Sequence, residues 1–168
     1  ALRSLANALA ELPCSLAHGE VIVRSENKAL VDYLDLNLRP LRELDLSRFD
    51  LIALVDTQPG TGNNSLPPGT PAHLILDHHP FRRASRTALL TDVRSRYGAT
   101  STLLTEYLVA GGVPIEPPLA TALVYGILSD TQNLSRQTTR RDVEAYLALY
   151  PLANRHMLAE IQRHPLPA

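Results

Sequence analysis

Two unbroken apolar runs in this chain each end in an acidic residue, and they constrain the fold more than any other feature. Residues 51–55 lead into Asp56, and residues 74–76 lead into Asp77-His78-His79. Short apolar runs rich in branched side chains favour parallel strands that are covered on both faces. Open α/β sheets bind ligands beyond the carboxyl ends of their strands. The sequence therefore predicts an α/β fold with a site at the edge where these polar residues lie.

The rest of the chain alternates helices with strands, which indicates a parallel sheet flanked by helices. Pro13 and Gly19 are expected to bracket a turn, and residues 58–70 to form a polar loop. A chain of 168 residues with 45% hydrophobic content suffices for one domain with a core, but not for two. We expect helices over residues 1–10, 26–36, 98–109, 117–128, 142–149 and 153–161, and strands over 21–23, 50–55, 73–76 and 88–90.

Composition excludes several classes of protein. A net charge of -1 argues against a protein that holds nucleic acid through bulk positive potential. The single cysteine excludes an internal disulfide and a cysteine-rich zinc site, and fits a cytoplasmic protein. No apolar stretch approaches the roughly 20 residues that span a bilayer, so no membrane partner is expected. Six tyrosines, two phenylalanines and no tryptophan favour short substrates over a long stacked single strand.

A third apolar run, residues 119–128, also ends in an acid, within Ser129-Asp130-Thr131. A buried polar group without a partner costs about 1–3 kcal/mol, so acids and imidazoles at the ends of buried elements favour a functional role. Carboxylate and neutral imidazole without thiolate suit Mn²⁺, Mg²⁺ or another divalent ion better than structural zinc. The sequence therefore predicts a divalent metal site.

Four segments resemble motifs of the DHH phosphoesterases, in the same order and with similar spacing. They are Val55-Asp56-Thr57, Asp77-His78-His79-Pro80, Tyr97 to Thr102 and Gly126 to Thr131. That superfamily includes RecJ-like exonucleases, nanoRNases that also act on pAp, cyclic dinucleotide phosphodiesterases, exopolyphosphatases and manganese pyrophosphatases. The resemblance covers nearly the whole chain. It implies the N-terminal catalytic domain of a Mn²⁺-dependent phosphoesterase that hydrolyses short oligonucleotides or nucleotides such as pAp.

The resemblance also implies a role for each residue. Asp56 would bridge two Mn²⁺ ions, for which Mg²⁺ is the alternative, and His78 and Asp130 would bind the second ion. Hydroxide held by the two ions would attack phosphorus. Of the two catalytic residues, His79 would face the substrate phosphate, and Asp77 would orient an imidazole by hydrogen bonding to its distal nitrogen.

Three further residues are expected to contact the substrate. Thr100 and Ser101 match the small polar residues that the family places near its active site at the start of a helix. Arg82 follows the Asp-His-His run closely enough to reach a substrate phosphate. Its guanidinium group also suits phosphate recognition.

One part of the family pattern is absent. Such proteins carry a first Asp-x-Asp motif that supplies much of the first metal site, and this chain has none. We expect the motif upstream of Ala1, and a C-terminal substrate-binding domain beyond Ala168. Residues 1–168 are then a truncated catalytic domain that is nearly inactive by itself; natural loss of the motif is the alternative.

Two other functions stay open. A family II inorganic pyrophosphatase or an exopolyphosphatase has similar segments, although Pro80 stands where the pyrophosphatases usually have lysine. A non-catalytic, nucleotide-sensing module would explain the missing motif. The sequence leaves a homodimer open as the oligomeric state.

Overall fold

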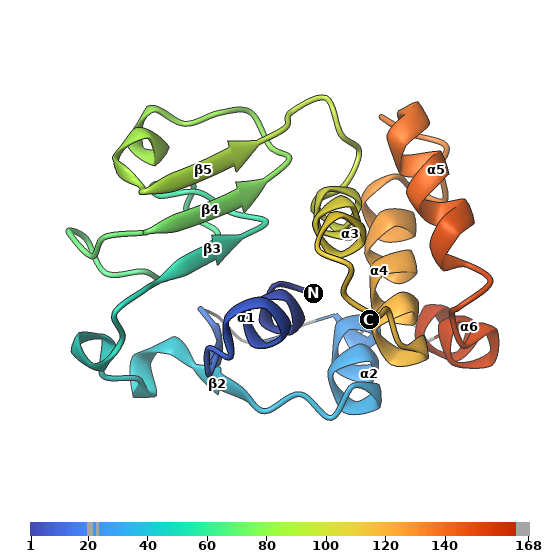
Figure 1. Cartoon of the computed structure of the whole chain (residues 1–168), viewed down its shortest axis with the longest axis horizontal. Coiled ribbons are helices and arrows are strands. Elements are labelled where there is room, and N and C mark those ends of the chain that lie inside the picture. The colour runs from blue at the N-terminus through green and yellow to red at the C-terminus, as the bar shows by residue number, and fades with distance from the viewer. Residues whose placement is uncertain (20–21, 23, 164–168) are drawn as a thin grey trace.

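The computed structural model describes residues 1–19, 22 and 24–163. Its helices and strands confirm the predicted α/β class (Figure 1). Within these residues the α-helices are α1 (Leu2–Ala10), α2 (Ser25–Tyr33), α3 (Thr100–Ala110), α4 (Pro117–Asp130), α5 (Arg140–Leu149) and α6 (Arg155–Arg163). The strands are β1 (Leu16–His18), β2 (Leu38–Pro40), β3 (Ala53–Val55), β4 (Leu74–Asp77) and β5 (Leu90–Val93), and the short 3₁₀ helices are η1 (Leu41–Glu43), η2 (Leu46–Arg48) and η3 (Arg83–Thr87).

All strand pairs are parallel, as predicted, but the strands form two separate sheets. β1 pairs with β2, and β4 lies between β3 and β5 in the second sheet. The turn predicted between Pro13 and Gly19 is wrong, because β1 occupies this segment, and β2 was not predicted. The strand predicted over 21–23 falls on residues of which 21 and 23 lie outside the described part of the chain.

The apolar run that contains β3 is less buried than its sequence indicates. Leu54 packs with Ala72 and Ile75 on one face of the sheet, whereas Ala53 and Val55 are exposed on the other. The prediction that this strand is covered on both faces is therefore wrong. The reason is that only one face of β3 packs against a core. In the described structure β3 is an edge strand of its three-stranded sheet.

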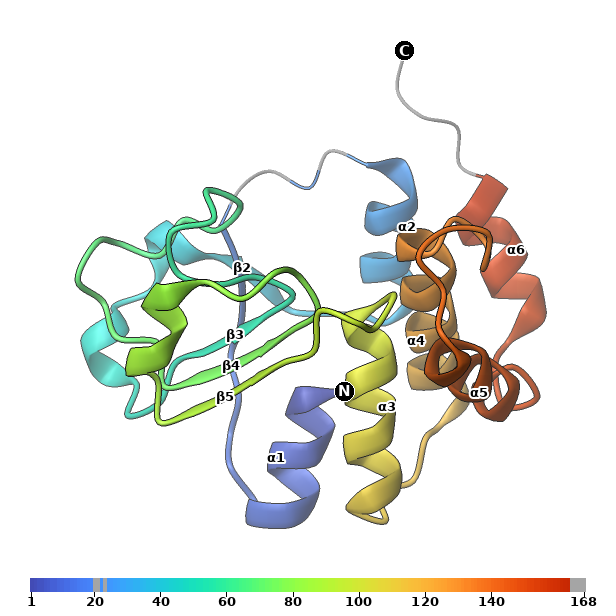
Figure 2. The same ribbon diagram turned by 90° about the horizontal axis from the view of Figure 1, so that it is seen from above.

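The larger core lies among the helices. α3 packs against α1, α4, α5 and β4, and α6 packs against α2 and α4; Figure 2 shows α1 beside α3. Leu76 of β4 is a buried member of this core and so connects the sheet to the helices. Side chains that are almost fully excluded from solvent fill it: Leu103, Leu108, Val124, Ile127, Leu149 and Ile161. The carboxyl ends of β3 to β5 consequently point toward the helices (Figure 1).

The helix boundaries follow local chemistry. Pro117 and Pro118 open α4, where a missing N–H costs nothing, and Gly112, at φ 63°, follows the end of α3. α2 stops earlier than predicted, and Asp35 after it has φ 45°. α4 runs further than predicted, so Asp130 lies in its last turn. None of the helices in the described residues is long and apolar enough to cross a membrane.

Gly126 permits the close approach of α4 to α3 near the site. A Cβ added there would clash with Ser101 Oγ. An exposed Gly→Ala change in a helix stabilises a protein by about 1 kcal/mol. We expect Gly126→Ala to do the opposite and to lower the free energy of unfolding by about 1–3 kcal/mol, because the added methyl group overpacks the interface. Urea unfolding measures the change.

Ser101→Ala provides the matched control. This substitution removes the clashing oxygen, so the double variant is expected to recover more than half of the loss. A Gly126→Ala variant as stable as the wild type would mean that the Ser101 hydroxyl rotates away and that the helices are not closely fitted here.

Candidate metal centre

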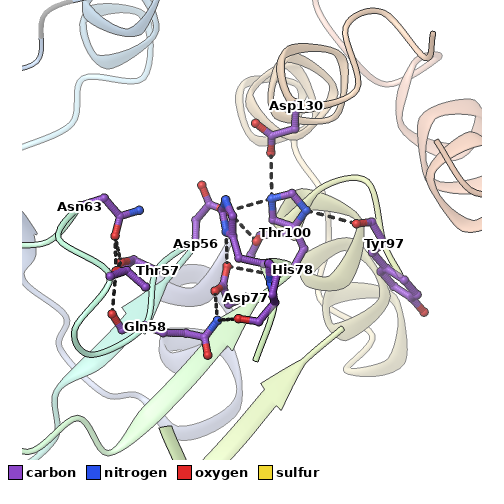
Figure 3. A network of polar contacts seen from close by, with 12 residues as sticks. Asp56, Thr57, Gln58, Asn63, Asp77, His78, Tyr97, Thr100 and Asp130 are labelled. Atoms are coloured by element: carbon purple, nitrogen blue, oxygen red, sulfur yellow. Dashed lines mark hydrogen bonds and ion pairs between the residues drawn. The ribbon is translucent and has the colours of Figure 1, made fainter. Parts of the chain in front are cut away.

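Side chains from β4, from α4 and from the segments that follow β3 and β4 meet at the carboxyl edge of the larger sheet. Asp56 directly follows β3, Asp77 ends β4, and His78 and His79 come next. Asp130 reaches the same place from α4 (Figure 3). His78 Nε2 lies 3.6 Å from Asp56 Oδ1 and 3.9 Å from Asp130 Oδ2. The structure thus brings together the three residues that the sequence predicts as metal ligands.

These separations suit a shared cation. Ligands about 2.0–2.1 Å from an octahedral ion lie about 3 Å apart when adjacent and about 4 Å apart when opposite. The distances from His78 to Asp56 and to Asp130 fall within this range. Ligand atoms of Asp56, His78 and His79 also lie within 4.8 Å of one another. His79, predicted as a catalytic residue, therefore lies beside the same cluster.

The His78 ring is oriented by a backbone carbonyl. Its Nδ1 lies 3.2 Å from the carbonyl oxygen of Tyr97. A carbonyl only accepts hydrogen bonds, so this contact is a hydrogen bond when Nδ1 carries the hydrogen, and in a neutral ring the lone pair is then on Nε2. That lone pair faces Asp56 and Asp130, which is the arrangement that a metal ligand requires.

Asp77 is fully buried and holds the other imidazole. Its carboxylate accepts hydrogen bonds from His79 Nδ1 at 2.8 Å, from Gln58 Nε2 at 2.6 Å and from the N–H of His78 at 2.8 Å. Burial by itself would raise the pKa of Asp77, but the bonds from His79 and Gln58 outweigh it and hold that pKa below its ordinary value. Asp77 is therefore a charged anchor, as expected for an acid that orients histidine.

His79 is the half-exposed partner of this acid. The hydrogen bond to Asp77 raises the pKa of the His79 imidazole, against the opposing effect of its partial burial. The carboxylates of Asp77, Asp56 and Asp130 add to the rise. With 48% of its side chain exposed, His79 presents a ring that favours the protonated, hydrogen-bond-donating form to solvent.

Gln58 fixes Asp77 from behind, and sequence reasoning missed it. Its amide group donates to Asp77 and to the carbonyl of Pro80, and its oxygen accepts from the Arg82 N–H and the Ser85 hydroxyl. Gln58 is completely buried, although the segment was correctly predicted to be a loop. Its position two residues after Asp56 is the sequence signal that could have found it.

Asp56 is held in an uncommon conformation. Its φ of 63° lies in the left-handed region, which aspartate tolerates better than most residues. Thr100, at the start of α3 and nearly fully buried, donates to Asp56 Oδ1 at 2.7 Å. Of the residues predicted to contact substrate, Thr100 thus anchors Asp56, Ser101 lies against Gly126, and Arg82 is exposed with its N–H bonded to Gln58.

Asp130 is partly desolvated and is repelled by the neighbouring carboxylate of Asp56, and both effects shift its pKa. The partial desolvation of its solvent-accessible carboxylate, and then the negative charge of Asp56, raise the pKa of Asp130 to about 6. The two histidines act in the opposite direction with smaller effect. A cation between the two carboxylates would remove their repulsion, so the cluster has the charge arrangement of a cation site.

Comparison with known proteins finds an archaeal relative. No protein-family model matches the chain. A protein of Methanocaldococcus jannaschii named "Uncharacterized protein MJ1633" is 38% identical to it over 138 residues, or 80% of this chain and 28% of that protein. The chain therefore spans little more than a quarter of the length of this archaeal relative, and the name of that protein states no activity.

The raised pKa of Asp130 predicts a change of stability with pH. Its pKa is about 6 in the folded protein and ordinarily 3.8, so between these values the folded state binds a proton that the unfolded state lacks. This contribution to stability is present at low pH and is lost as the pH rises through about 6. Asp130→Asn should therefore raise the metal-free free energy of unfolding near pH 7.5 by on the order of 1 kcal/mol.

Urea unfolding with a chelator measures this gain, which should shrink as the pH is lowered toward about 4. The exposed Asp50→Asn removes one carboxylate elsewhere and is expected to change stability little at either pH. A loss of stability in Asp130→Asn near neutral pH would contradict the predicted repulsion.

Proposed function

We propose that this chain provides the metal-binding part of a Mn²⁺-dependent phosphoesterase that hydrolyses short oligonucleotides or nucleotides such as pAp. The observation that carries the proposal is the convergence of Asp56 and Asp130 on the Nε2 atom of His78. These residues come from segments that resemble three of the DHH motifs. The fourth segment supplies Thr100, which hydrogen bonds to Asp56.

The ligand chemistry supports a hard to borderline divalent ion. Carboxylate oxygen combined with imidazole, and no thiolate in the cluster, suits Mn²⁺ and admits Mg²⁺. Bound divalent ions supply a Lewis acid for phosphoryl oxygens and for an attacking water. The Asp56 side chain is 49% exposed, so its carboxylate is accessible for its proposed role as a bridging ligand.

His79 adds the group that would meet the substrate. Its Nδ1 is held by Asp77, so the opposite edge of the ring is the part left to face a ligand. The raised pKa of His79 favours the imidazolium, which donates a hydrogen bond to an anionic oxygen. In the proposed reaction this contact stabilises negative charge on the phosphoryl group, while Asp77 and Gln58 keep the ring in place.

Metal binding by the chain is the first test. We expect Asp56→Asn and His78→Ala each to weaken Mn²⁺ binding at least about tenfold, as measured by titration calorimetry. Substituting a residue that only hydrogen bonds to a metal ligand already lowers metal affinity by about this factor, and these two residues are the proposed ligands themselves. His156→Ala is the control, since His156 is exposed on α6. Equal Mn²⁺ affinity in all variants would refute the site.

Hydrolysis is then measured on the protein in its full encoded length with Mn²⁺, comparing pAp, an RNA of a few nucleotides and pyrophosphate. Turnover of pAp or RNA that is lost in Asp56→Asn is the expected result. Turnover of pyrophosphate alone would favour the pyrophosphatase alternative. Mn²⁺ binding without turnover of any of the three would favour the nucleotide-sensing module.

A further inference from the structure

The peptide unit between Tyr97 and Gly98 is held at both of its polar ends. Its carbonyl oxygen accepts the hydrogen bond from His78 Nδ1 at 3.2 Å. Its N–H, which belongs to Gly98, lies 3.1 Å and 3.0 Å from the two carboxylate oxygens of Asp142. A continuous chain of hydrogen bonds therefore joins Asp142 on α5 to the imidazole in the metal centre.

Asp142 is built as a fixed charge. It is completely buried, and its oxygens also accept from the Thr102 hydroxyl at 2.6 Å and from the N–H and hydroxyl of Thr139 at 2.7 Å and 2.6 Å. Burial would raise the pKa of Asp142, but the bonds from Thr102, Thr139 and Gly98 together lower it below the ordinary value. The carboxylate is ionised and cannot turn without breaking several bonds.

The backbone between the acid and the imidazole has little freedom to move. A Cβ on Gly98 would lie 2.7 Å from Thr131 Cγ2, 2.8 Å from the Gln137 carbonyl oxygen and 2.9 Å from Asp142 Oδ2. On the other side, the Tyr97 hydroxyl bonds to Glu106, at 2.9 Å. The peptide unit is thus clamped by its neighbours as well as by its hydrogen bonds.

We infer that Asp142 is a positioning residue for the metal ligand His78, acting through the Tyr97–Gly98 peptide. A carboxylate that accepts from the N–H polarises the peptide and strengthens its carbonyl as an acceptor, since linked hydrogen bonds reinforce one another. The stronger carbonyl holds the hydrogen on Nδ1 and keeps the Nε2 lone pair toward Asp56 and Asp130. In many metal sites a carboxylate bonds the histidine directly; here one peptide group stands between them.

The capping arrangement of α5 does not account for all of these contacts. As the third residue of the helix, Asp142 needs only Thr139 to complete a capping box. The bonds to Gly98 and Thr102 bridge 44 and 40 residues of sequence and reach the start of α3. The metal role of His78 rests on the proposed function, whereas the orientation of its ring by Asp142 does not.

Asp142→Asn tests the inference, because asparagine keeps the shape but loses the charge. Nitrogen NMR of the ring in the metal-free protein, recorded at a pH at which the ring is neutral, should report His78 with its hydrogen on Nδ1 in the wild type, and a shift toward the Nε2–H form in the variant. Mn²⁺ affinity should fall about 10- to 100-fold, the usual effect of a residue that orients a metal ligand.

Thr102→Val is the matched control, since it removes a different bond to the same carboxylate and leaves the peptide contact in place. It should lower stability without changing the His78 tautomer or the Mn²⁺ affinity. An Asp142→Asn variant that folds and keeps the wild-type tautomer would overturn the inference. If the wild type binds no Mn²⁺, the proposed function fails, but the tautomer comparison still decides the role of Asp142.

A measurement on the unaltered protein covers the case in which Asp142→Asn does not fold. During titration with diamagnetic Mg²⁺, the Gly98 amide proton should shift, because a cation on Nε2 draws charge through His78 and the peptide. The amide of Ala145, one turn further along α5, serves as the reference. A Gly98 shift no larger than that of Ala145, in a protein that binds Mg²⁺, would count against the inference.

Discussion

The parallel pairing of β3 with β4, with Val55 opposite Leu76, is the constraint on which the site depends. It brings Asp56 and Asp77 to the same edge, and the Asp56 N–H continues the ladder to the Leu76 carbonyl at 2.9 Å. A slip by one residue would turn every side chain of a strand to the opposite face. Ile75 would then leave its core, and Asp77 would lose the buried position from which it binds His79. Packing of the sheet and geometry of the cluster therefore select the same register.

Two buried carboxylates act on two adjacent histidines by separate routes. Asp77 bonds directly to the ring of His79 and is itself held by Gln58. Asp142 reaches the ring of His78 across a peptide group. The adjacent residues His78 and His79 are thus oriented from different sides. Asp77 of the sheet and Gln58 of the loop after β3 hold His79, whereas Asp142 of α5 holds His78. Each acid is satisfied by several donors, which is how a low-dielectric interior tolerates a charge.

The sequence predicted well what depends on local pattern. The apolar runs located β3 and β4, and Pro117 located the start of α4. The acids that end these runs, Asp56 and Asp130, lie near each other around His78. The sequence could not predict β1 and β2, which have three residues each and exist through their mutual pairing. Gln58 and Asp142 were also beyond local pattern, since their decisive partners lie 19 and 44 residues away. Their burial follows from tertiary contacts that no spacing of polar residues encodes.

The division of the structure into two cores has a thermodynamic consequence. Leu54, Ala72 and Ile75 form the smaller core beneath the sheet, and the larger one lies among the helices. Asp56 and His78 belong to the sheet side, whereas Asp130 belongs to α4. An ion bound by all three would be bonded to both halves, so separating them would require its release. By linkage, the free energy of ion binding would then add to the free energy of unfolding, and the two halves would unfold together.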